Sequence, residues 1–161
     1  MPGIEHEAAV ELLRRNPELA AALLASVGVQ IPAGATAVMA DSNLSVPEPT
    51  ELRADLVTLH QGTGGKLAIV TEVQTDPPSK KKRRAWPAYV AVAQVEHECD
   101  AVLIVIALRP GTARSSARPI PTGHPGFVLR PIVIGRDNTP APEGPEAAEL
   151  TVLAEIGRAH V

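Results

Sequence analysis

Two acidic side chains and an amide stand in neighbouring aliphatic stretches of the sequence. Glu72 and Gln74 interrupt LAIVTEVQT (67–75), which begins as an aliphatic strand suited to a protein core. Because side chains alternate along a strand, Glu72 and Gln74 share one face. Asp55 belongs to ELRADLVTLH (51–60), whose alternation predicts the preceding strand. A hairpin that registers Asp55 opposite Glu72 would bring two carboxylates and an amide together.

Two carboxylates that meet in this way need a cation or a proton between them. At a separation of about 4 Å they repel by roughly 4 kcal/mol at an effective dielectric of 20. Oxygen ligands of this kind suit Mg²⁺ or Mn²⁺, which bind through one or two carboxylates, a backbone carbonyl and waters. Such an ion polarises a phosphodiester and lowers the pKa of its bound water.

Five consecutive cations, Lys80 to Arg84, follow the carboxylates almost at once. They lie at or just before the start of a predicted helix, where the helix dipole is already positive, so they gain nothing locally. Phosphate oxygens would relieve this repulsion. The formal net charge is −3, yet the segment from Lys80 to Arg136 holds ten Lys and Arg against three acidic residues, a local balance of +7. A carboxylate pair beside a basic stretch is what metal-dependent phosphodiester cleavage requires.

The elements predicted around these residues combine helices and strands, which indicates an α/β fold. Proline positions set several of their limits, since Pro87 is tolerated only in the first turn of a helix and Pro131 favours a sheet edge. In chain order, the predictions are two helices within 4–26 separated at Pro17, a short strand over 39–46, strands over 51–60 and 67–74 joined by a turn at 61–65, a helix over 85–98, a fully buried strand over 101–108, an irregular segment over 109–126 and a strand over 127–135.

Composition bounds the class of protein. A chain of 161 residues suits one domain that buries roughly two-thirds of its unfolded surface. The single Cys99 excludes an internal disulfide framework and a cysteine zinc site, so a reducing compartment is expected. No stretch approaches the ~18 apolar residues of a membrane span, and the N-terminus lacks the features of a signal peptide. We therefore expect no membrane partner and a cytoplasmic location. The abundance of Arg and Ala suggests a bacterial source.

The order of these residues resembles the PD-(D/E)XK nuclease-like superfamily. The resemblance lies in Asp55, in Glu72-Val73-Gln74 at a strand end, and in a following helix that carries Arg84, Trp86 and Tyr89. A Glu-x-Gln second motif, in place of Glu-x-Lys, is typical of its transposase-like, recombination-promoting branch. The resemblance covers about residues 4–108, and TGHPGFVLRPIVIG is similar to a stretch of bacterial proteins with the same core. It implies a restriction-endonuclease-like αβββαβ core, with a mixed central sheet flanked by helices.

The resemblance also implies a function and a site. It implies metal-dependent hydrolysis of DNA phosphodiester bonds by an endonuclease-like protein, associated with mobile elements or recombination. Asp55 and Glu72 would bind Mg²⁺ or Mn²⁺ with the backbone carbonyl of Val73, and Gln74 would position the attacking water or the scissile phosphate. DNA would be held through its backbone phosphates, and the residues expected to contact it are Lys80, Lys82, Arg83, Arg84 and Tyr89.

One departure from the superfamily pattern bears on catalysis. The usual Lys stabilises the developing negative charge, and losing one such donor typically costs ~2.7–4 kcal/mol. Gln74 donates a hydrogen bond but carries no charge. Lys80, Lys82 or Arg84 would have to reach in from the helix start. If none does, the domain binds nucleic acid without cutting it.

Other interpretations of the same residues stay open. Asp55 and Glu72 could be solvated strand ends or form a salt bridge with Arg53, and the cationic run could be a solvated loop. Trp86 and Tyr89 fit core packing as well as base stacking. At the level of function there are two alternatives. One is a nuclease-derived module that binds nucleic acid without catalysis. The other is a protein-interaction domain, which could be a homodimer, whose segment 109–126 contacts a partner.

The predicted domain organisation has three parts. A nuclease-like domain covers 1–136, and a Pro/Glu/Ala-rich linker over 137–154 leads toward a missing C-terminal region. EIGRAHV, residues 155–161, is what read-through of a common sequencing adapter encodes in one frame. We therefore expect this tail to be non-native and the natural chain to continue.

Overall fold

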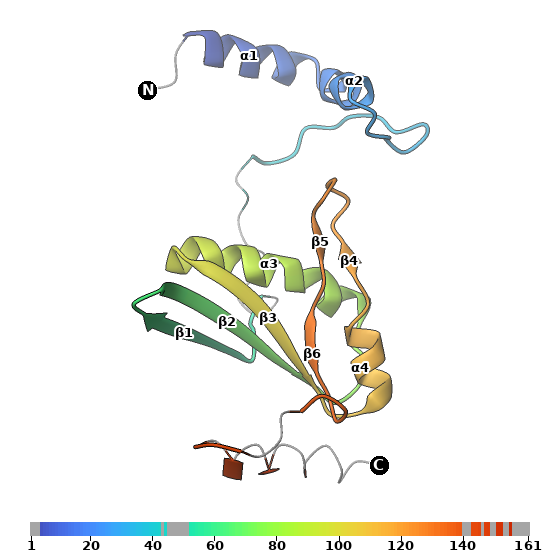
Figure 1. The fold of residues 1–161 in the computed structure, drawn as a ribbon. Coiled ribbons are helices and arrows are strands. Elements are labelled where there is room, and N and C mark those ends of the chain that lie inside the picture. Colours follow the sequence, from blue (N-terminus) through green and yellow to red (C-terminus); the bar gives the residue numbers. More distant parts are fainter. Residues whose placement is uncertain are drawn as a thin grey trace. The chain divides into compact units, whose positions relative to one another are not determined.

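Aliphatic stretches between residues 56 and 134 build the central sheet of the computed structural model (Figure 1). The structure describes residues 4–42, 44, 52–139, 143–145, 147, 148, 151, 152 and 155. The chain separates into an N-terminal unit, Met1–Ser45, and a second unit, Val46–Val161. The predicted domain limits at 136 and 154 remain predictions, and most of the predicted tail 155–161 lies outside the described residues.

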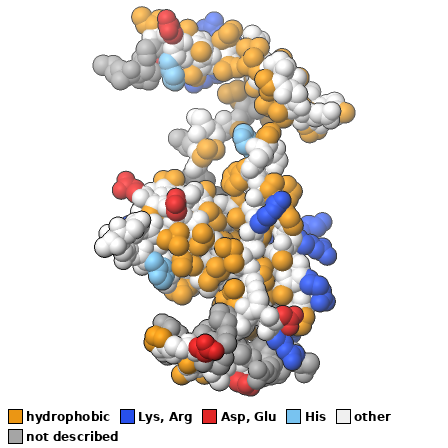
Figure 2. All heavy atoms as spheres, viewed as in Figure 1, with side chains coloured by type: hydrophobic (Ala, Val, Ile, Leu, Met, Phe, Trp, Pro, Cys, Tyr) orange, Lys and Arg blue, Asp and Glu red, His pale blue; other side chains and the backbone are white. Residues whose placement is uncertain are grey.

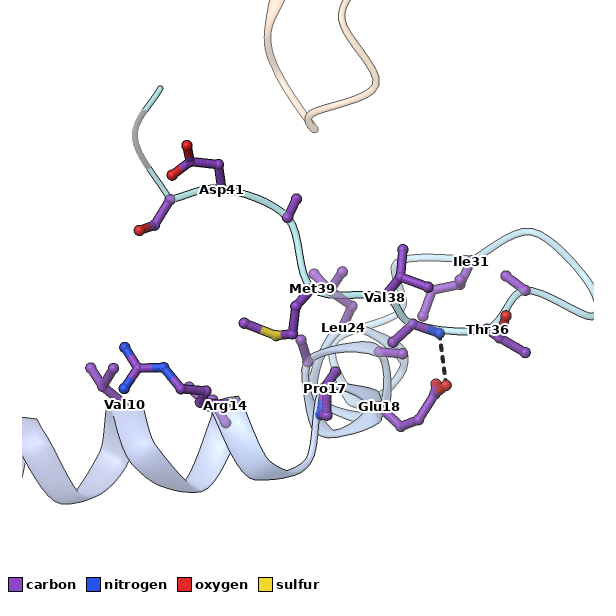
Figure 3. A pocket seen from close by; sticks show the side chains of 17 residues that line it. Val10, Arg14, Pro17, Glu18, Leu24, Ile31, Thr36, Val38, Met39 and Asp41 are labelled. Carbon is purple, nitrogen blue, oxygen red and sulfur yellow. Dashed lines mark hydrogen bonds between the residues drawn. The ribbon is translucent and has the colours of Figure 1, made fainter. Parts of the chain in front are cut away.

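Pro17 divides the N-terminal unit into two helices, as the sequence predicts. They are α1 (Ile4–Arg15) and α2 (Glu18–Ser26), and neither has a buried residue. The following segment returns along them, and Ala37 N donates a hydrogen bond of 2.7 Å to Glu18 Oε1. Figure 3 shows the side chains around the hollow between these parts, which has a volume of about 770 Å³ and a mainly apolar lining. The predicted strand over 39–46 is wrong for 39–42 and 44, which form none, and its remaining positions lie outside the described residues.

The sheet of the second unit is mixed and has the strand order β1-β2-β3-β6. The predicted hairpin is confirmed, because β1 (Leu56–Gly62) runs antiparallel to β2 (Gly65–Gln74). Its bounds differ from the prediction, since residues 52–55 form no strand and the pairing continues into the predicted turn 61–65. The other two strands, β3 (Asp100–Ala107) and β6 (Ile132–Ile134), run parallel to their neighbours. An α/β fold with a mixed central sheet is thus present. The expected αβββαβ core has three strands before its second helix, whereas the described residues have two, β1 and β2.

Helix α3 (Lys80–His97) connects the parallel strands β2 and β3. The helix predicted over 85–98 therefore starts five residues earlier, and the alternative of a cationic loop is wrong. The start is set by Ser79, whose Oγ accepts a hydrogen bond of 3.1 Å from Lys82 N, as an N-cap residue does. Pro87 accordingly lies inside the helix and is buried, where it cannot donate the usual bond to the Arg83 carbonyl.

The core lies between α3 and one face of the sheet. Strand residues of that face and residues of α3 pack together, and Ile120 closes the cluster from the side. The buried hydrophobic residues of this cluster are Ala68, Val70, Trp86, Tyr89, Ala93, Leu103, Val105 and Ile120. Trp86 and Tyr89 are 0% and 5% exposed, which confirms the packing interpretation of both aromatic residues.

The segment after β3 is more regular than its composition predicts. Residues 109–126 contain a short helix, α4 (Pro110–Ser116), with proline in its first turn, where a missing N–H costs nothing. A separate two-stranded sheet pairs β4 (Ile120–Pro121) with β5 (Val128–Leu129). The predicted strand 127–135 is therefore two strands, β5 and β6, which belong to different sheets. Pro131 separates them, and β6 takes the predicted edge position.

The sheet face opposite α3 is aliphatic and open to solvent among the described residues. Val102, Ile104 and Ile106 of β3 are half-buried, whereas Leu103, Val105 and Ala107 on the α3 side are buried. The predicted fully buried strand over 101–108 is thus buried on one face only. Figure 2 shows the hydrophobic side chains that gather over β1, β2 and β3. Within the described part of the chain, none of the helices has the length and apolarity needed to cross a bilayer.

Candidate functional site

The β1–β2 register brings Asp55 and Glu72 together. Leu56 pairs with Thr71, so Asp55, one residue before β1, lies beside Glu72. Asp55 N donates a hydrogen bond of 3.3 Å to Glu72 Oε1, and Val73 N donates one of 2.8 Å to Asp55 Oδ2. Each carboxylate therefore accepts a hydrogen bond from a peptide N–H of the opposite segment. The convergence expected from strand alternation is present.

Glu72 is a fully buried carboxylate with partners on both oxygens. Its exposed fraction is 0%, at a position where β2 otherwise places Ala68 and Val70 in the core. Its Oε2 accepts a hydrogen bond of 3.3 Å from Gln74 Nε2 and lies 2.7 Å from Lys82 Nζ. Burying a carboxylate without partners is very costly, so these contacts are what make the burial of Glu72 tolerable.

Lys82 is the cation that reaches the carboxylates from α3. The sequence leaves Lys80, Lys82 and Arg84 as candidates, and the N-cap at Ser79 sets the helix phase that turns Lys82 inward. Lys82 Nζ also lies 5.8 Å from the centroid of the Tyr89 ring, two turns further along the helix. Burial acts to lower the pKa of Lys82, but the hydrogen bond and charge of Glu72 outweigh it and raise the pKa above 10.5. Lys82 is therefore an ammonium at neutral pH.

Tyr89 supports the site from within the core. Its hydroxyl donates a hydrogen bond of 3.2 Å to the Arg53 carbonyl, which holds the segment that carries Asp55. Burial and the charges of Glu72 and Asp55 raise the pKa of Tyr89, although Lys82 opposes this. Among the ion pairs of the described residues, none joins Arg53 to either carboxylate. Because Tyr89 is buried, its ring supports the site and offers no open face to DNA.

Arg83 is engaged by the protein itself, a role that the sequence does not predict. Its guanidinium donates to carbonyl oxygens at the end of α4 and in the segment that joins α4 to β4, and it lies 5.9 Å from the Trp86 ring. Burial and the charge of Arg118 lower the pKa of Arg83 below its ordinary value. The four donor contacts are to the carbonyls of Ser115 (2.8 Å), Ser116 (3.2 Å), Arg118 (2.6 Å) and Pro119 (3.4 Å).

The remaining predicted phosphate contacts, Lys80 and Arg84, line a groove on a different face of α3 from Lys82, and neither carboxylate is part of its lining. Both side chains are exposed. The groove has a volume of about 470 Å³ and lies between α3 and the β4 segment. Its lining residues are Lys80, Arg83, Arg84, Pro87, Pro119, Ile120, Pro121 and Thr122.

The oxygen atoms at the end of β2 suit a hard divalent cation. The carboxylates of Asp55 and Glu72 offer oxygen donors, the type of ligand that Mg²⁺ and Mn²⁺ prefer. Asp55 is exposed, so an ion has access to it from solvent. Among the described residues, no group of three or more His, Cys, Asp or Glu lies close enough to hold a metal ion.

Comparison of the chain with family models, with curated proteins and with solved structures finds no match.

Proposed function

We propose that this protein hydrolyses DNA phosphodiester bonds in a Mg²⁺- or Mn²⁺-dependent reaction, as an endonuclease-like member of the PD-(D/E)XK superfamily. The observation that supports it is the contact between Lys82 Nζ and the buried carboxylate of Glu72, at 2.7 Å. A cation beside the Asp55–Glu72 pair replaces the charge that Gln74 lacks. The mobile-element or recombination context and a cytoplasmic location are part of the same proposal.

Asp55, Glu72 and the carbonyl of Val73 would hold the metal ion. When bound, the ion polarises the scissile phosphate and lowers the pKa of a coordinated water. The protein keeps its ligands in place beforehand, because the peptide N–H groups of Asp55 and Val73 fix the two carboxylates. Such preorganisation removes the cost of ordering the ligands at the moment of reaction.

Lys82 and Gln74 would act on the phosphate and on the attacking water. The Lys82 ammonium, 30% exposed, lies beside the site and can donate to a phosphate oxygen as negative charge develops. Gln74 Nε2 donates to Glu72, which orients its amide oxygen toward other donors, a water among them. Lys80 and Arg84 would hold the flanking phosphates. Because these contacts are to phosphate, we expect little sequence readout and a steep salt dependence of binding.

Plasmid nicking tests the proposal. Supercoiled plasmid is incubated with Mg²⁺, Mn²⁺ or EDTA and with the wild type, Glu72→Ala or a control variant, Glu96→Ala, which removes an exposed carboxylate of α3. We expect the wild type and Glu96→Ala to nick in the presence of a metal ion, and Glu72→Ala to lose at least a hundredfold in rate. Equal nicking by wild type and Glu72→Ala would show a contaminating nuclease and remove the enzyme proposal.

A second candidate is a nuclease-derived module that binds nucleic acid without cutting it. It is favoured by the partners that both Glu72 oxygens already have, which include the Lys82 ammonium. This candidate predicts salt-dependent DNA binding that survives both EDTA and the Asp55→Ala change. Binding under those two conditions, without nicking by the wild type in any metal, would select it over the nuclease.

A further inference from the structure

The three aromatic residues of the chain occupy different environments. Trp86 and Tyr89 are buried in the core, but Phe127 is 46% exposed. An exposed aromatic ring is unusual in a chain with so few, because burial of Phe contributes about 1.5–3 kcal/mol to stability. Phe127 lies at the end of the turn that joins β4 to β5, a hairpin that extends from the body of the second unit (Figure 1).

The hairpin tip is held in one conformation by its own hydrogen bonds. Thr122 donates twice to the Phe127 carbonyl, through its N–H at 3.2 Å and its Oγ1 at 2.8 Å, and Phe127 N donates to the His124 carbonyl at 3.0 Å. Gly123 and Gly126 take φ values of +94° and +76°, which L side chains rarely adopt. The ring of Phe127 is therefore presented on a preorganised turn, which lowers the entropy lost on binding.

The same hairpin forms one wall of the cationic groove. Thr122, the hydrogen-bond partner of Phe127, lines the groove opposite Lys80 and Arg84 of α3. Arg118 and Arg130 flank the hairpin and are exposed. Figure 2 shows Lys and Arg side chains on the side of the molecule that carries β4, β5 and α4. An exposed aromatic ring next to a groove of cations is the arrangement of sites that track a phosphate backbone and stack on its bases.

We propose that the β4–β5 hairpin is a nucleic-acid-binding arm on which Phe127 stacks against an unpaired DNA base while the cations of the groove hold the adjacent phosphates. This inference rests on the proposed function and adds to it the form of the substrate. Unpaired bases are favoured because their faces are open, whereas wedging a ring into a duplex first costs a few kcal/mol of unstacking. The arm therefore directs the protein to single-stranded or distorted DNA.

Fluorescence anisotropy in EDTA tests the arm without any contribution from cleavage. The full chain is titrated with a labelled single-stranded oligothymidine, with its duplex, and with an oligonucleotide of the same length whose central residues are abasic. Phe127→Ala is compared with Val128→Ala, a neighbour on the same hairpin that is 42% exposed, and with Phe127→Trp. Circular dichroism establishes that each variant is folded.

We expect Phe127→Ala to weaken binding of the oligothymidine by about fivefold or more, since one base–aromatic stack contributes at least that much. Val128→Ala should bind like the wild type, and Phe127→Trp should retain affinity and show quenched indole emission on binding. On the abasic oligonucleotide, wild type and Phe127→Ala should bind equally. Arg84→Ala should weaken binding to both oligonucleotides alike, because it removes a phosphate contact.

Two outcomes would overturn the inference, and they differ from failure of the proposed function. One is equal binding of the oligothymidine by wild type and Phe127→Ala. The other is an effect of Phe127→Ala that persists on the abasic oligonucleotide. In either case the nuclease proposal stands if metal-dependent nicking remains. Absence of DNA binding by the wild type at low salt would remove both proposals at once.

Discussion

Glu72 occupies a position on β2 at which the two preceding residues on the same face, Ala68 and Val70, are apolar and buried. The position is tolerable because the carboxylate meets a peptide N–H, an amide and the Lys82 ammonium. Removing one member of such a buried pair leaves an uncompensated charge, which costs far more than the net stabilisation of the intact pair. We therefore expect the effects of substitutions at Glu72 and Lys82 on the unfolding free energy to be coupled.

Replacing Lys82 with Met should destabilise the protein by about 3 kcal/mol, at the lower end of the cost of breaking a buried pair because Lys82 is partly solvated. In a Glu72→Gln background the same replacement should cost much less, since no buried charge is left behind. Urea denaturation of the two single variants and the double variant measures this coupling. Equal costs of Lys82→Met in the two backgrounds would contradict the ion pair.

The pH dependence of that pair follows from the raised pKa of Lys82. A lysine whose pKa in the folded state exceeds its unfolded value of 10.5 adds stability that is fully present below pH 10.5. The contribution is lost as the pH rises through the folded-state pKa. The difference in unfolding free energy between wild type and Lys82→Met should therefore stay constant from neutral pH to about 10.5. A difference that shrinks already between neutral pH and pH 10 would contradict the raised pKa.

Among the elements, α3 decides which cation reaches the carboxylates. Each residue of an α-helix turns about 100° from the one before, so a shift of one residue turns an inward side chain by more than a quarter turn, away from its partner. Ser79 sets this start through its bond to Lys82 N. The hairpin of β1 and β2 does the same for Asp55, because its register determines which residues lie opposite one another.

Ser79→Ala should lower the unfolding free energy by about 1 kcal/mol, the usual cost of losing an N-cap. Ser79→Asp should retain the cap and add a favourable negative charge next to the cations and the positive end of the helix. We expect Ser79→Asp to be at least as stable as the wild type by thermal denaturation, while its DNA affinity falls through repulsion of phosphate. Equal stability of Ser79→Ala and wild type would show that the cap does not set the helix start.

Prediction from sequence succeeds at this scale where periodicity is local, and fails where tertiary contacts decide. The alternation around Glu72 identifies the hairpin and the shared face, since period two needs no knowledge of the rest of the fold. The start of α3 is missed because a run of cations resembles a solvated loop. Helix α4 is missed because Pro110 and its small polar neighbours indicate a turn. Thr112 there is buried and donates to the Thr75 carbonyl at 2.9 Å, a contact that no local pattern encodes.

At the scale of the whole second unit, the described residues cover one face of the sheet and leave the other open. Parallel strands are usually covered on both faces, and the continuous aliphatic run of β3 is typical of that arrangement. The two faces of β2 therefore provide a matched comparison of a buried and an exposed aliphatic position, with Val70 at 1% and Val73 at 48% exposure.

Val70→Thr should lower the unfolding free energy by about 1–3 kcal/mol, because it places a hydroxyl in the core without a partner. Val73→Thr should change it by no more than about 0.5 kcal/mol, as exposed substitutions usually do. Urea denaturation of the two variants measures both values. A large cost at Val73 would mean that the open face is covered in solution, and equal small costs would contradict the core described for β2.

Arg83 connects the two walls of the groove. Its guanidinium donates to four carbonyls between residues 115 and 119, so this side chain helps to set the spacing between α3 and the opposite groove wall. Lysine at this position would keep the charge but has no planar fork to span several acceptors. Arg83→Lys should therefore loosen the contact between α3 and residues 115–119, which would widen the groove without altering its charge.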